Sequence, residues 1–265
     1  MLECIVNVSE GRDPAVLAAL ATAAGNDLLD QHVDPHHHRT VLTTVGEDAA
    51  RRISRVAVDR VDLTRHRGVH PRLGVVDVVP FVALAGSTPD DACAGRDRFA
   101  RWVAGELGVP AFLYGDDRGL PTLPAVRRRA FGDLAPDTGP PVPHPTAGAV
   151  AVSCRGPLVA YNVWLAEDDL AQARAVAAAV RGDGIRALGL TVGDRVQVSM
   201  NLVAPHRVGP AVAYDRVAAL APVAGAELVG LLPRSVLDAV EPARWPELDL
   251  AEDRTVEARL EGRGR

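Results

Sequence analysis

The chain has 265 residues, of which 48% are apolar, so it can form two units of about 100 to 150 residues, each with its own core. The formal net charge is −5 and charges of both signs are interspersed, which excludes a large basic face for nucleic acid. The chain opens without a basic leader, and no apolar stretch reaches the ~18 residues of a membrane span, so we expect a soluble, cytoplasmic protein that binds neither nucleic acid nor membrane.

The first half of the chain predicts alternating strands and helices. Residues 2–8 carry β-branched side chains in loose alternation, and Ser9, Gly11 and Asp13 mark a turn before Pro14 opens a helix to about residue 24. The next expected elements are a strand at 28–31, a strand at 39–46, a helix at 47–63, a buried strand at 73–84, a helix at 87–107 and a strand at 110–114.

The pattern breaks between residues 115 and 156, where Pro, Gly and Arg dominate. This stretch includes LPAVRRRAF and PDTGPPVPHPTAG, with apolar residues spaced through it. A loop this long inside a compact protein is usually a linker or a functional segment, and we expect this one to be partly both.

The second half restarts the order of the first. Tyr161, Asn162 and Val163 precede an acidic turn and an Ala-rich helix, as residues 6–8 do in the first half. The remaining expected elements are extended segments at 187–192 and 195–203, a helix at 208–220, a strand at 227–232 and a helix from 234.

Both halves therefore have the order strand, helix, strand, strand, helix, strand, which is that of the split βαβ, ferredoxin-like unit. We predict an α+β fold of two tandem ferredoxin-like α/β subdomains, each a β-sheet with helices packed on one face. The subdomains are expected at 1–155 and 156–265. The charged stretch after Pro246 is expected to fray.

The cysteines predict reduced thiols. Cys4, Cys93 and Cys154 are widely spaced, odd in number and in apolar contexts. This distribution favours buried, reduced side chains over disulfides or a zinc site.

The segment HVDPHHHR, at residues 32–39, contains several side chains that could bind a metal ion. Imidazoles and carboxylates bind zinc, but adjacent histidines on extended backbone point in alternate directions, so at most two of His36, His37 and His38 can face one site. We predict no metal here, with a zinc site as the alternative. His32 with Arg39 fits an anion-binding arrangement better, because a guanidinium can bind a carboxylate with two hydrogen bonds.

The stretch at residues 65–80, RHRGVHPRLGVVDVVP, is the strongest candidate for a catalytic loop. It places two histidines and three arginines immediately before an apolar segment. Pro71 restricts His70 to extended conformations, and the neighbouring cations disfavour a protonated imidazole, so His70 could act as a general base near neutral pH. The alternative is a solvated basic turn.

Several common enzyme signatures are absent from the sequence. It contains no GxSxG nucleophile elbow, no phosphate-binding loop, no GxGxxG fingerprint and no paired carboxylates of the glycoside hydrolase kind. What remains is a base, arginines suited to carboxylates, and a Gly/Pro-rich stretch whose backbone could approach a flat ligand.

A series of segments resembles the formiminotransferase domain family. In chain order they are NVSEGRD, DPHHHRTVLTTVG, RHRGVHPRLGVVDVVPF, PAFLYG, APDTGP, AYNV, VQVSMNL and AELVGLLP. The resemblance spans nearly the whole chain, and HRGVHPRLGVVDVVPF is its most specific part. It implies two similar α/β subdomains, a homodimer, and transfer of a formimino group from N-formimino-L-glutamate to N5 of tetrahydrofolate, the co-substrate. No part of the chain resembles the cyclodeaminase that is fused to this domain in some relatives.

The resemblance also implies roles for particular residues. His70 matches the catalytic histidine, which would take a proton from N5 of tetrahydrofolate and return one to the departing amino acid nitrogen. Arg39 and Arg72 would hold carboxylates, and Asp77 could orient an imidazole or a guanidinium. The candidate substrate contacts are His32, Arg39, Arg72, Asp77 and Asn162. The segment that matches the folate contact comprises Gly139, Pro140, Pro141, Val142, Pro143, His144, Pro145, Thr146, Ala147 and Gly148.

Three positions depart from the usual pattern of the family. His38 and Trp164 stand where Asn is usual, and Ala147 stands where an aromatic residue is common. An indole adds bulk and accepts no hydrogen bond, so a different formimino donor is an alternative, as is an inactive folate- or small-ligand-binding protein on the same scaffold. The candidates for holding the glutamate tail of folate, with a solvated helix face as the alternative, are Arg127, Arg128 and Arg129.

Overall fold

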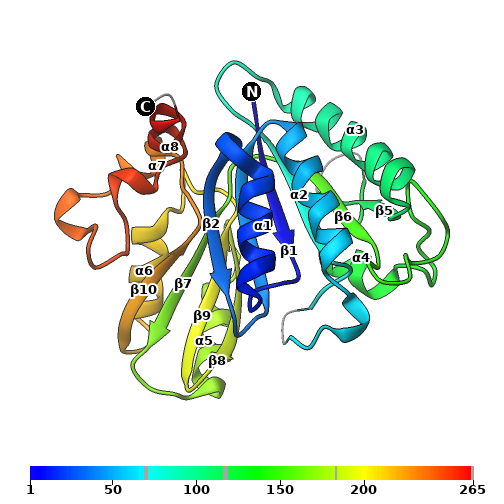
Figure 1. Cartoon of the computed structure of the whole chain (residues 1–265). Coiled ribbons are helices and arrows are strands. Elements are labelled where there is room, and N and C mark those ends of the chain that lie inside the picture. Colours follow the sequence, from blue (N-terminus) through cyan, green and yellow to red (C-terminus); the bar gives the residue numbers. More distant parts are fainter. Residues whose placement is uncertain (69–70, 116–118, 183, 264–265) are drawn as a thin grey trace. The chain divides into compact units, whose positions relative to one another are not determined.

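The computed structural model of the chain describes residues 1–68, 71–115, 119–182 and 184–263. The chain divides into two compact units, Met1–Gly156 and Pro157–Arg265, and each has its own sheet and hydrophobic core (Figure 1). The predicted α+β class, with a sheet in each half of the chain, is confirmed.

The first unit is built on a six-stranded sheet in the order β2-β3-β1-β4-β6-β5. Its elements are β1 (Leu2–Val8), α1 (Pro14–Ala24), η1 (Gly25–Asp27), β2 (Leu28–Asp34), β3 (Arg39–Val45), α2 (Glu47–Arg60), η2 (Leu63–Arg65), β4 (Val76–Ala83), α3 (Pro89–Leu107), β5 (Ala111–Leu113), α4 (Leu123–Arg129) and β6 (Val150–Arg155). Strands β1 to β4 pair antiparallel and complete the predicted strand-helix-strand-strand-helix-strand unit, which β6 and β5 extend in parallel beyond β4.

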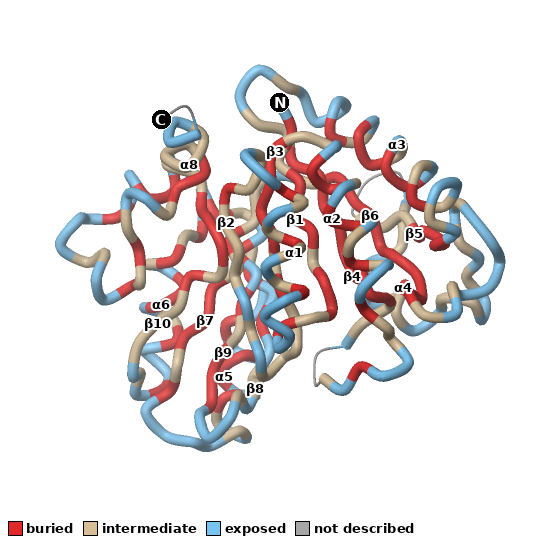
Figure 2. Tube along the Cα trace, viewed as in Figure 1, coloured by how far each residue is buried: buried red, intermediate tan, exposed pale blue. Residues whose placement is uncertain are grey.

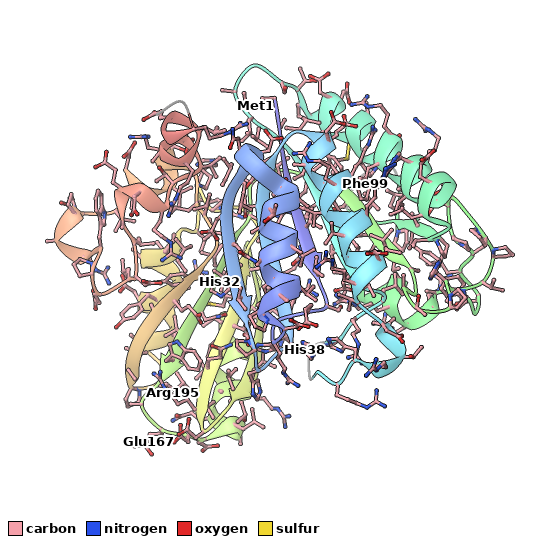
Figure 3. The ribbon with its side chains drawn as sticks, in the orientation of Figure 1. Met1, His32, His38, Phe99, Glu167 and Arg195 are labelled. Carbon is pink, nitrogen blue, oxygen red and sulfur yellow. A yellow bond between two sulfur atoms is a disulfide. The ribbon has the colours of Figure 1, made fainter. Side chains whose placement is uncertain are left out.

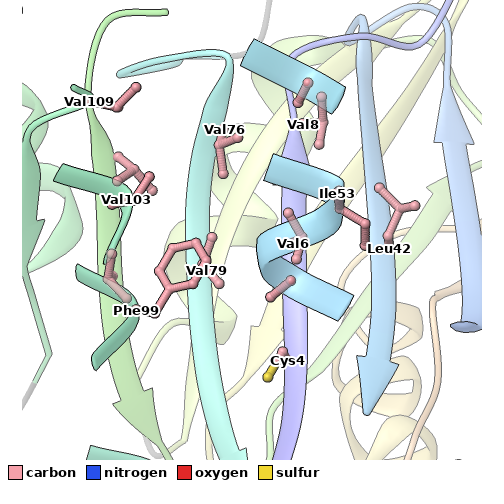
Figure 4. Packing of buried hydrophobic residues seen from close by; sticks show 14 of the residues in the cluster. Cys4, Val6, Val8, Leu42, Ile53, Val76, Val79, Phe99, Val103 and Val109 are labelled. Carbon is pink, nitrogen blue, oxygen red and sulfur yellow. The ribbon is translucent and has the colours of Figure 1, made fainter. Parts of the chain in front are cut away.

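Helices α1, α2 and α3 cover one face of this sheet. Figure 2 shows in red the buried parts of the first sheet and of the helices. Along β1 every second residue is buried, so Cys4, Val6 and Val8 share one face and belong to the core with the helices. There they pack with side chains such as Ile53 of α2 and Phe99 of α3 (Figure 4). The shorter helix α4 packs on the opposite face, where Val126 is buried with Phe112 and Ala149.

Side chains and glycine define where these helices begin and end. Asp13 accepts the first free N–H groups of α1, and Pro14 supplies the first helical residue. Thr88 and Asp91 form a capping box at the start of α3, which ends at Gly108 in the left-handed conformation with φ 64°. Among the described helices, none has the length together with the hydropathy that crossing a membrane requires.

The second unit is built on a four-stranded antiparallel sheet in the order β10-β7-β9-β8. Its elements are β7 (Val159–Leu165), α5 (Leu170–Val180), β8 (Ile185–Val192), β9 (Arg195–Leu202), α6 (Pro210–Ala218), β10 (Val223–Val229), α7 (Arg234–Leu237), η3 (Pro242–Arg244), η4 (Glu252–Arg254) and α8 (Val256–Gly262). As in the first unit, the first strand lies between the third and the fourth. Tyr161 and Val163 enter the core with the helices, so Asn162 and Trp164 lie on the other face.

The stretch from 115 to 156 was expected to lack regular structure, and that prediction was wrong. It contains α4 and the central strand β6, whose residues are buried from Val150 to Cys154. A strand buried on both faces lacks the alternation that marks a half-exposed strand, and here it follows a run of Pro and Gly. No periodic pattern therefore distinguishes this strand from the loop that precedes it.

The prediction of reduced cysteines was also wrong for two of the three. Cys93 of α3 and Cys154 of β6 form a disulfide, with their Cα atoms 4.9 Å apart, and Cys4 is a buried free thiol. The two cysteines are separated by 61 residues in sequence, but α3 packs directly on β6. Their pairing thus depends on a tertiary contact that residue spacing does not reveal.

The C-terminal stretch is folded, contrary to the expected fraying. Leu248, Leu250 and Val256 are buried, the first two within the core of the second unit. The hydroxyl of Tyr161 donates to the Leu248 carbonyl at 2.8 Å. Buried apolar side chains spaced among the charged ones therefore anchor this segment.

Candidate active site

A buried carboxylate lies at the centre of the polar residues of the first unit. Asp77 of β4 is fully buried and accepts hydrogen bonds at 2.6 Å from both Arg39 Nη1 and Arg127 Nη2. The backbone N–H of Leu73 donates to its other oxygen at 2.7 Å. Arg39 also donates through Nη2 to Asn7 Oδ1 at 2.9 Å. We refer to Asn7, Arg39, Asp77 and Arg127 as the Asp77 cluster.

The charges of this cluster do not cancel. Burial alone would raise the pKa of Asp77, but the guanidiniums of Arg39 and Arg127 outweigh it and lower that pKa below its ordinary value. Asp77 is therefore ionised at neutral pH, and two positive charges share one negative charge. Both arginine side chains are largely buried, at 13% and 21% exposure, so the excess positive charge is poorly screened and favours an anionic ligand.

The cluster combines predicted residues with residues that the sequence did not identify. Arg39 and Asp77 were predicted as substrate contacts and lie together, whereas Asn7 was not predicted. Arg127 was considered together with Arg128 and Arg129 as a contact for the glutamate tail of folate, and those two arginines are exposed. The difference arises because Val126 of α4 is buried against Phe112 and Ala149, which turns the next residue towards the sheet. The apolar Val126 directly before Arg127 is the sequence feature that could have distinguished this arginine from the other two.

The turn between β2 and β3 packs against residues 61–68, which follow α2. The rings of His38 and His66 are stacked, with centroids 4.2 Å apart and an angle of 26° between planes. A Cβ atom on Gly68 would lie 2.7 Å from His66 Cε1 and 2.8 Å from the His37 carbonyl oxygen, so the contact leaves no room for a side chain there. Figure 3 shows His38 at this end of the first sheet.

Both stacked histidines are held neutral. Burial lowers the pKa of His66, whose Nε2 donates to the His38 carbonyl at 3.1 Å while its buried Nδ1 has no hydrogen-bond partner within the described ranges. Burial is also the main cause of the lowered pKa of His38, with Arg12 and Arg72 adding to it against the opposing effect of Glu10. The stacked pair therefore adds no positive charge of its own, and the charges that act on it come from Arg12, Arg72 and Glu10.

Two other predicted contacts have structural positions that bear on their roles. Arg72 donates to the carbonyls of Gly68 and His66, both at 3.2 Å, so its guanidinium is held against residues 66–68. His32 is paired with Val41 in the strand register, which puts its side chain on the same face as Arg39.

The segment matched to the folate contact has an exposed part and a fixed part. Residues 139–143 are exposed, Val142 at 60%. The following residues make a tight turn in which His144 and Gly148 exchange backbone hydrogen bonds of 2.8 and 2.9 Å. His144 Nδ1 also accepts from the N–H of Ala147 at 3.0 Å.

Backbone hydrogen bonds fix this turn against the loop that precedes β4. The N–H of Leu63 donates to the Thr146 carbonyl at 2.8 Å, and the N–H of Val75 donates to the Ala147 carbonyl at 2.9 Å. At Gly148, with φ 70°, a Cβ would lie 2.5 Å from the Leu73 carbonyl oxygen. The turn at 144–148 is therefore fixed against Leu63, Leu73 and Val75.

The second unit carries Asn162 on the face of its sheet opposite to the helices. Asn162 is 8% exposed and donates through Nδ2 to Glu227 Oε2 at 3.0 Å. Two residues along the same strand, the ring of Trp164 has the guanidinium of Arg195 4.4 Å from its centroid, a cation–π contact (Figure 3 labels Arg195).

The predicted catalytic residue, His70, lies outside the described residues, so its role stays a prediction. In the histidine-rich segment, His36 and His37 pack edge to face with centroids 5.5 Å apart, and His37 Nδ1 makes a short contact with Asp34 Oδ2. Within the described ranges, no three or more His, Cys, Asp or Glu side chains come together in a way that could hold a metal ion.

Known proteins resemble this chain along most of its length. Residues 1–155 match the family model described as formiminotransferase domain, N-terminal subdomain. A glutamate formimidoyltransferase of Streptococcus pyogenes serotype M1 is 36% identical, over 91% of this chain and 92% of its own. One of Thermoplasma acidophilum is 33% identical, over 89% of each chain. The formimidoyltransferase-cyclodeaminase of Sus scrofa is 33% identical over 90% of this chain, which spans 51% of that longer protein.

Proposed function

The chain belongs to the formiminotransferase family and is a transferase, and from this premise we propose that it moves a formimino group from N-formimino-L-glutamate to N5 of tetrahydrofolate. The observation that carries the proposal is the match to two proteins named glutamate formimidoyltransferase along about nine tenths of each chain. The reaction belongs to histidine degradation and one-carbon metabolism. In this proposal residues 1–155 and 156–265 are the N- and C-terminal subdomains of the transferase.

The Asp77 cluster is the proposed binding site for a carboxylate of the donor. Its two guanidiniums and one carboxylate leave one positive charge in excess, and arginine binds carboxylates in a planar, two-bond geometry. Asp77 itself holds the guanidiniums of Arg39 and Arg127 in place and so acts as a positioning residue. His32, on the same face of the sheet as Arg39, and Asn162 are proposed as further donor contacts.

His70 is proposed as the general acid–base group. It takes the proton from N5 of tetrahydrofolate as this nitrogen bonds to the formimino carbon, and it gives a proton to the glutamate nitrogen as the old C–N bond breaks. The proton count balances, because one N–H is lost and one is formed. Such catalysis contributes roughly 10²- to 10⁴-fold in rate, and holding both substrates together contributes further. Arg72, which donates to the carbonyls of His66 and Gly68, is proposed to support this step by holding residues 66–68 in place.

Tetrahydrofolate is proposed to lie along residues 139–148. The exposed Gly139–Pro143 backbone can approach a flat ring closely, and the turn at 144–148 is fixed by hydrogen bonds against the loop that precedes β4. The family resemblance further supports a homodimer that works in the cytoplasm.

A formimino donor other than the glutamate derivative is the second candidate, and Trp164 is the observation that favours it. An indole with the Arg195 guanidinium over its ring occupies the strand position where the family usually has Asn. The pair is bulkier than a carboxamide and carries a positive charge, so a donor with a smaller side chain or an additional anionic group would suit it.

A transfer assay tests the proposal. Purified protein is mixed with tetrahydrofolate and N-formimino-L-glutamate, and 5-formiminotetrahydrofolate is followed over time. We expect turnover that falls about 10²- to 10⁴-fold in His70→Ala and stays unchanged in His206→Ala, a matched control at an exposed position of the second unit.

The possible results separate the alternatives. Full activity of His70→Ala would contradict the assigned role of that residue. No turnover of the unmodified protein, with tetrahydrofolate binding seen by calorimetry, would favour a different donor or a binding protein without turnover. No turnover and no folate binding would overturn the proposed function.

A further inference from the structure

The face of the second sheet that carries Asn162 also holds a buried polar atom without a partner. Val196 and Val198 of β9 enter the core that is formed with the helices. The alternation of side chains along the strand therefore puts Arg195 and Gln197 on the opposite face. Gln197 is 2% exposed, and its buried Oε1 accepts no hydrogen bond within the described ranges. A buried acceptor without a donor costs free energy, so a ligand that supplies an N–H group there is favoured.

The guanidinium of Arg195 is held in place but makes no ion pair with the described residues. Its central carbon lies 4.4 Å from the centroid of the Trp164 ring, on the neighbouring strand β7. No carboxylate in the described part of the chain lies within ion-pair distance of it. An arginine stacked on an aromatic ring keeps the N–H groups of its edge available, and this edge matches a carboxylate. The ring thus orients a positive charge that can bind an anion.

The unpaired cation and the unpaired acceptor meet at Trp164. In the pairing of β7 with β9, Trp164 lies directly opposite Gln197, and Arg195 is the diagonal neighbour two residues away. Cβ atoms of opposite residues are about 4.5–5.5 Å apart and those of diagonal residues about 7–8 Å, so both side chains reach the same indole. Asn162, proposed above as a substrate contact, lies two residues along β7 on the same face. The polar surface around Asn162 therefore includes both groups.

We propose that Arg195 and Gln197 form a subsite for a carboxylate with a neighbouring N–H group, and that Trp164 is the positioning residue that holds the guanidinium. The inference rests on the proposed function and deepens it. Arg195 binds the carboxylate through the edge of its guanidinium, and Gln197 Oε1 accepts from the N–H.

Both substrates of the proposed reaction carry this combination of groups. In N-formimino-L-glutamate, the α-carboxylate adjoins the N–H that bears the formimino group. In tetrahydrofolate, the α-carboxylate of the glutamate tail adjoins the amide N–H. The shared chemistry defines the subsite, and the experiment below identifies which of the two compounds occupies it.

The competing explanation is a surface contact that binds no ligand. A cation–π pair can serve only to cover the indole, and a water molecule can satisfy a buried amide oxygen. The two explanations differ in the effect of Gln197→Met, which keeps the length of the side chain and removes the unpaired acceptor. A subsite predicts weaker substrate binding in a protein that is at least as stable, whereas a surface contact predicts unchanged binding.

The test measures KM for each substrate in the transfer assay. It uses Arg195→Ala, Gln197→Met and the control Arg174→Ala. Arg174 is an exposed arginine of α5, which packs on the other face of the same sheet, so this control removes an equal charge away from the subsite. We expect Arg195→Ala to raise the KM of one substrate roughly 10- to 100-fold at nearly constant kcat, because the lost contact is present before and during the reaction. Gln197→Met should raise the same KM by a smaller factor, with an unfolding midpoint no lower than that of the unmodified protein. Arg174→Ala should keep both KM values within about 2-fold.

Two variants of Trp164 test its positioning role. Trp164→Asn removes the ring beneath the guanidinium and should raise the KM that Arg195→Ala raises. Trp164→Phe keeps an aromatic face and should restore most of the affinity. Equal KM values in the two variants would overturn the positioning role of the ring.

The substrate whose KM changes identifies the bound carboxylate. A rise for N-formimino-L-glutamate alone assigns the subsite to the formimino donor. A rise for tetrahydrofolate alone assigns it to the glutamate tail, and tetrahydropteroate, which lacks that tail, should then bind equally well to Arg195→Ala and to the unmodified protein. KM values of both substrates within about 2-fold in Arg195→Ala, or a loss in kcat alone, would overturn the inference and leave the proposed function intact.

Calorimetry with each substrate alone tests the subsite without turnover. If the unmodified protein shows no turnover but Arg195→Ala binds either compound roughly 10-fold more weakly, the proposed reaction fails and the subsite stands. If neither compound binds to the unmodified protein, the proposed function and this inference are both overturned.

Discussion

The two sheets place an asparagine at matching positions but surround it differently. Asn7 of β1 and Asn162 of β7 each lie on the first strand of their unit, between the third and fourth strands. Asn7 accepts from Arg39, whose position in the neighbouring strand corresponds to that of Gln197 in the second sheet. Asn162 instead donates to Glu227 of β10. The same strand arrangement thus holds Arg39, Arg127 and Asp77 around the asparagine of the first unit, and a single carboxylate, Glu227, beside that of the second.

The two units share a strand order, but among the described residues only the first has a buried charged cluster on its sheet, and elements added to that unit contribute to the cluster. The first unit adds α4, β5 and β6 after its fourth strand, and α4 contributes Arg127 to the buried Asp77. The second unit adds α7, η3, η4 and α8 after its fourth strand, and its sheet gains no further strand within the described residues. A buried carboxylate is tolerated only where enough donors surround it, and the extra elements supply them.

Removal of the carboxylates at the two matched sites should therefore have unequal effects. Asp77→Ala leaves two largely buried guanidiniums without their partner, and we expect it to lower the free energy of unfolding by about 3–5 kcal/mol. Glu227→Ala removes the hydrogen bond to Asn162 from a half-buried residue, and for this bond we expect a cost of about 1 kcal/mol. Urea unfolding of both variants measures the difference. Equal values would contradict the view that only the first site is an enclosed charge network.

The disulfide offers a second contrast, because all three cysteines belong to the first unit. Cys93 and Cys154 close a loop of 61 residues, for which the chain-entropy model gives up to about 4 kcal/mol. We expect a reductant to lower the unfolding midpoint of the unmodified protein and to leave the double variant C93S/C154S unchanged. A midpoint that ignores the reductant in both proteins would contradict a contribution of this bond to stability.

Two glycines with positive φ allow the cost of backbone strain to be measured separately from the cost of a steric clash. Gly148, φ 70°, would place a Cβ 2.5 Å from a carbonyl oxygen, whereas Gly193, φ 65°, has open space around that position. Gly193→Ala should cost about 1–2 kcal/mol from strain alone. Gly148→Ala should cost about 1–3 kcal/mol more, because the turn must move away from the loop. Denaturant midpoints that coincide for the two variants would mean that the turn is not fixed there.

The smallest expected effect is a pH dependence that originates in the first unit. The pKa values of His38 and His66 are lowered in the folded protein, so the unfolded chain binds more protons as pH falls below about 6.5. Their contribution to stability is complete above that pH and is lost on acidification. We expect urea midpoints to fall less steeply between about pH 7.5 and 5.5 in His66→Gln than in the unmodified protein. His206→Gln, exposed in the second unit, should keep the original slope, and an equal slope in all three proteins would contradict the assignment.

The sequence predicted the repeated strand and helix order because half-exposed strands and amphipathic helices have distinct periods. It did not predict β6, which is buried on both faces, nor the disulfide, which depends on α3 packing against that strand. In each case the missing information was tertiary. The order of the elements could be derived from local pattern, whereas their partners could not.

For the site, sequence reasoning identified Arg39 and Asp77 by residue type but not their direct contact. It treated Arg127 as one of three equivalent arginines. Which side of α4 meets the sheet depends on the burial of Val126, and this tertiary contact cannot be read from three consecutive arginines. The departure at His38 has a local explanation. Its φ of 53° lies in the left-handed region, where asparagine and histidine are both enriched, so the exchange keeps the turn and adds a ring that stacks on His66.

The strand order of the first unit has a consequence for biosynthesis. β6 lies between β4 and β5, and it is the strand partner of β5 within the described ranges. During translation β5 emerges well before the residues that can bind it to the sheet, and β6 (Val150–Arg155) must have left the ribosome before the sheet closes. The edge of β4 stays unpaired until then, so a nascent chain stalled inside the Pro-rich stretch would expose an apolar strand edge and be prone to aggregate.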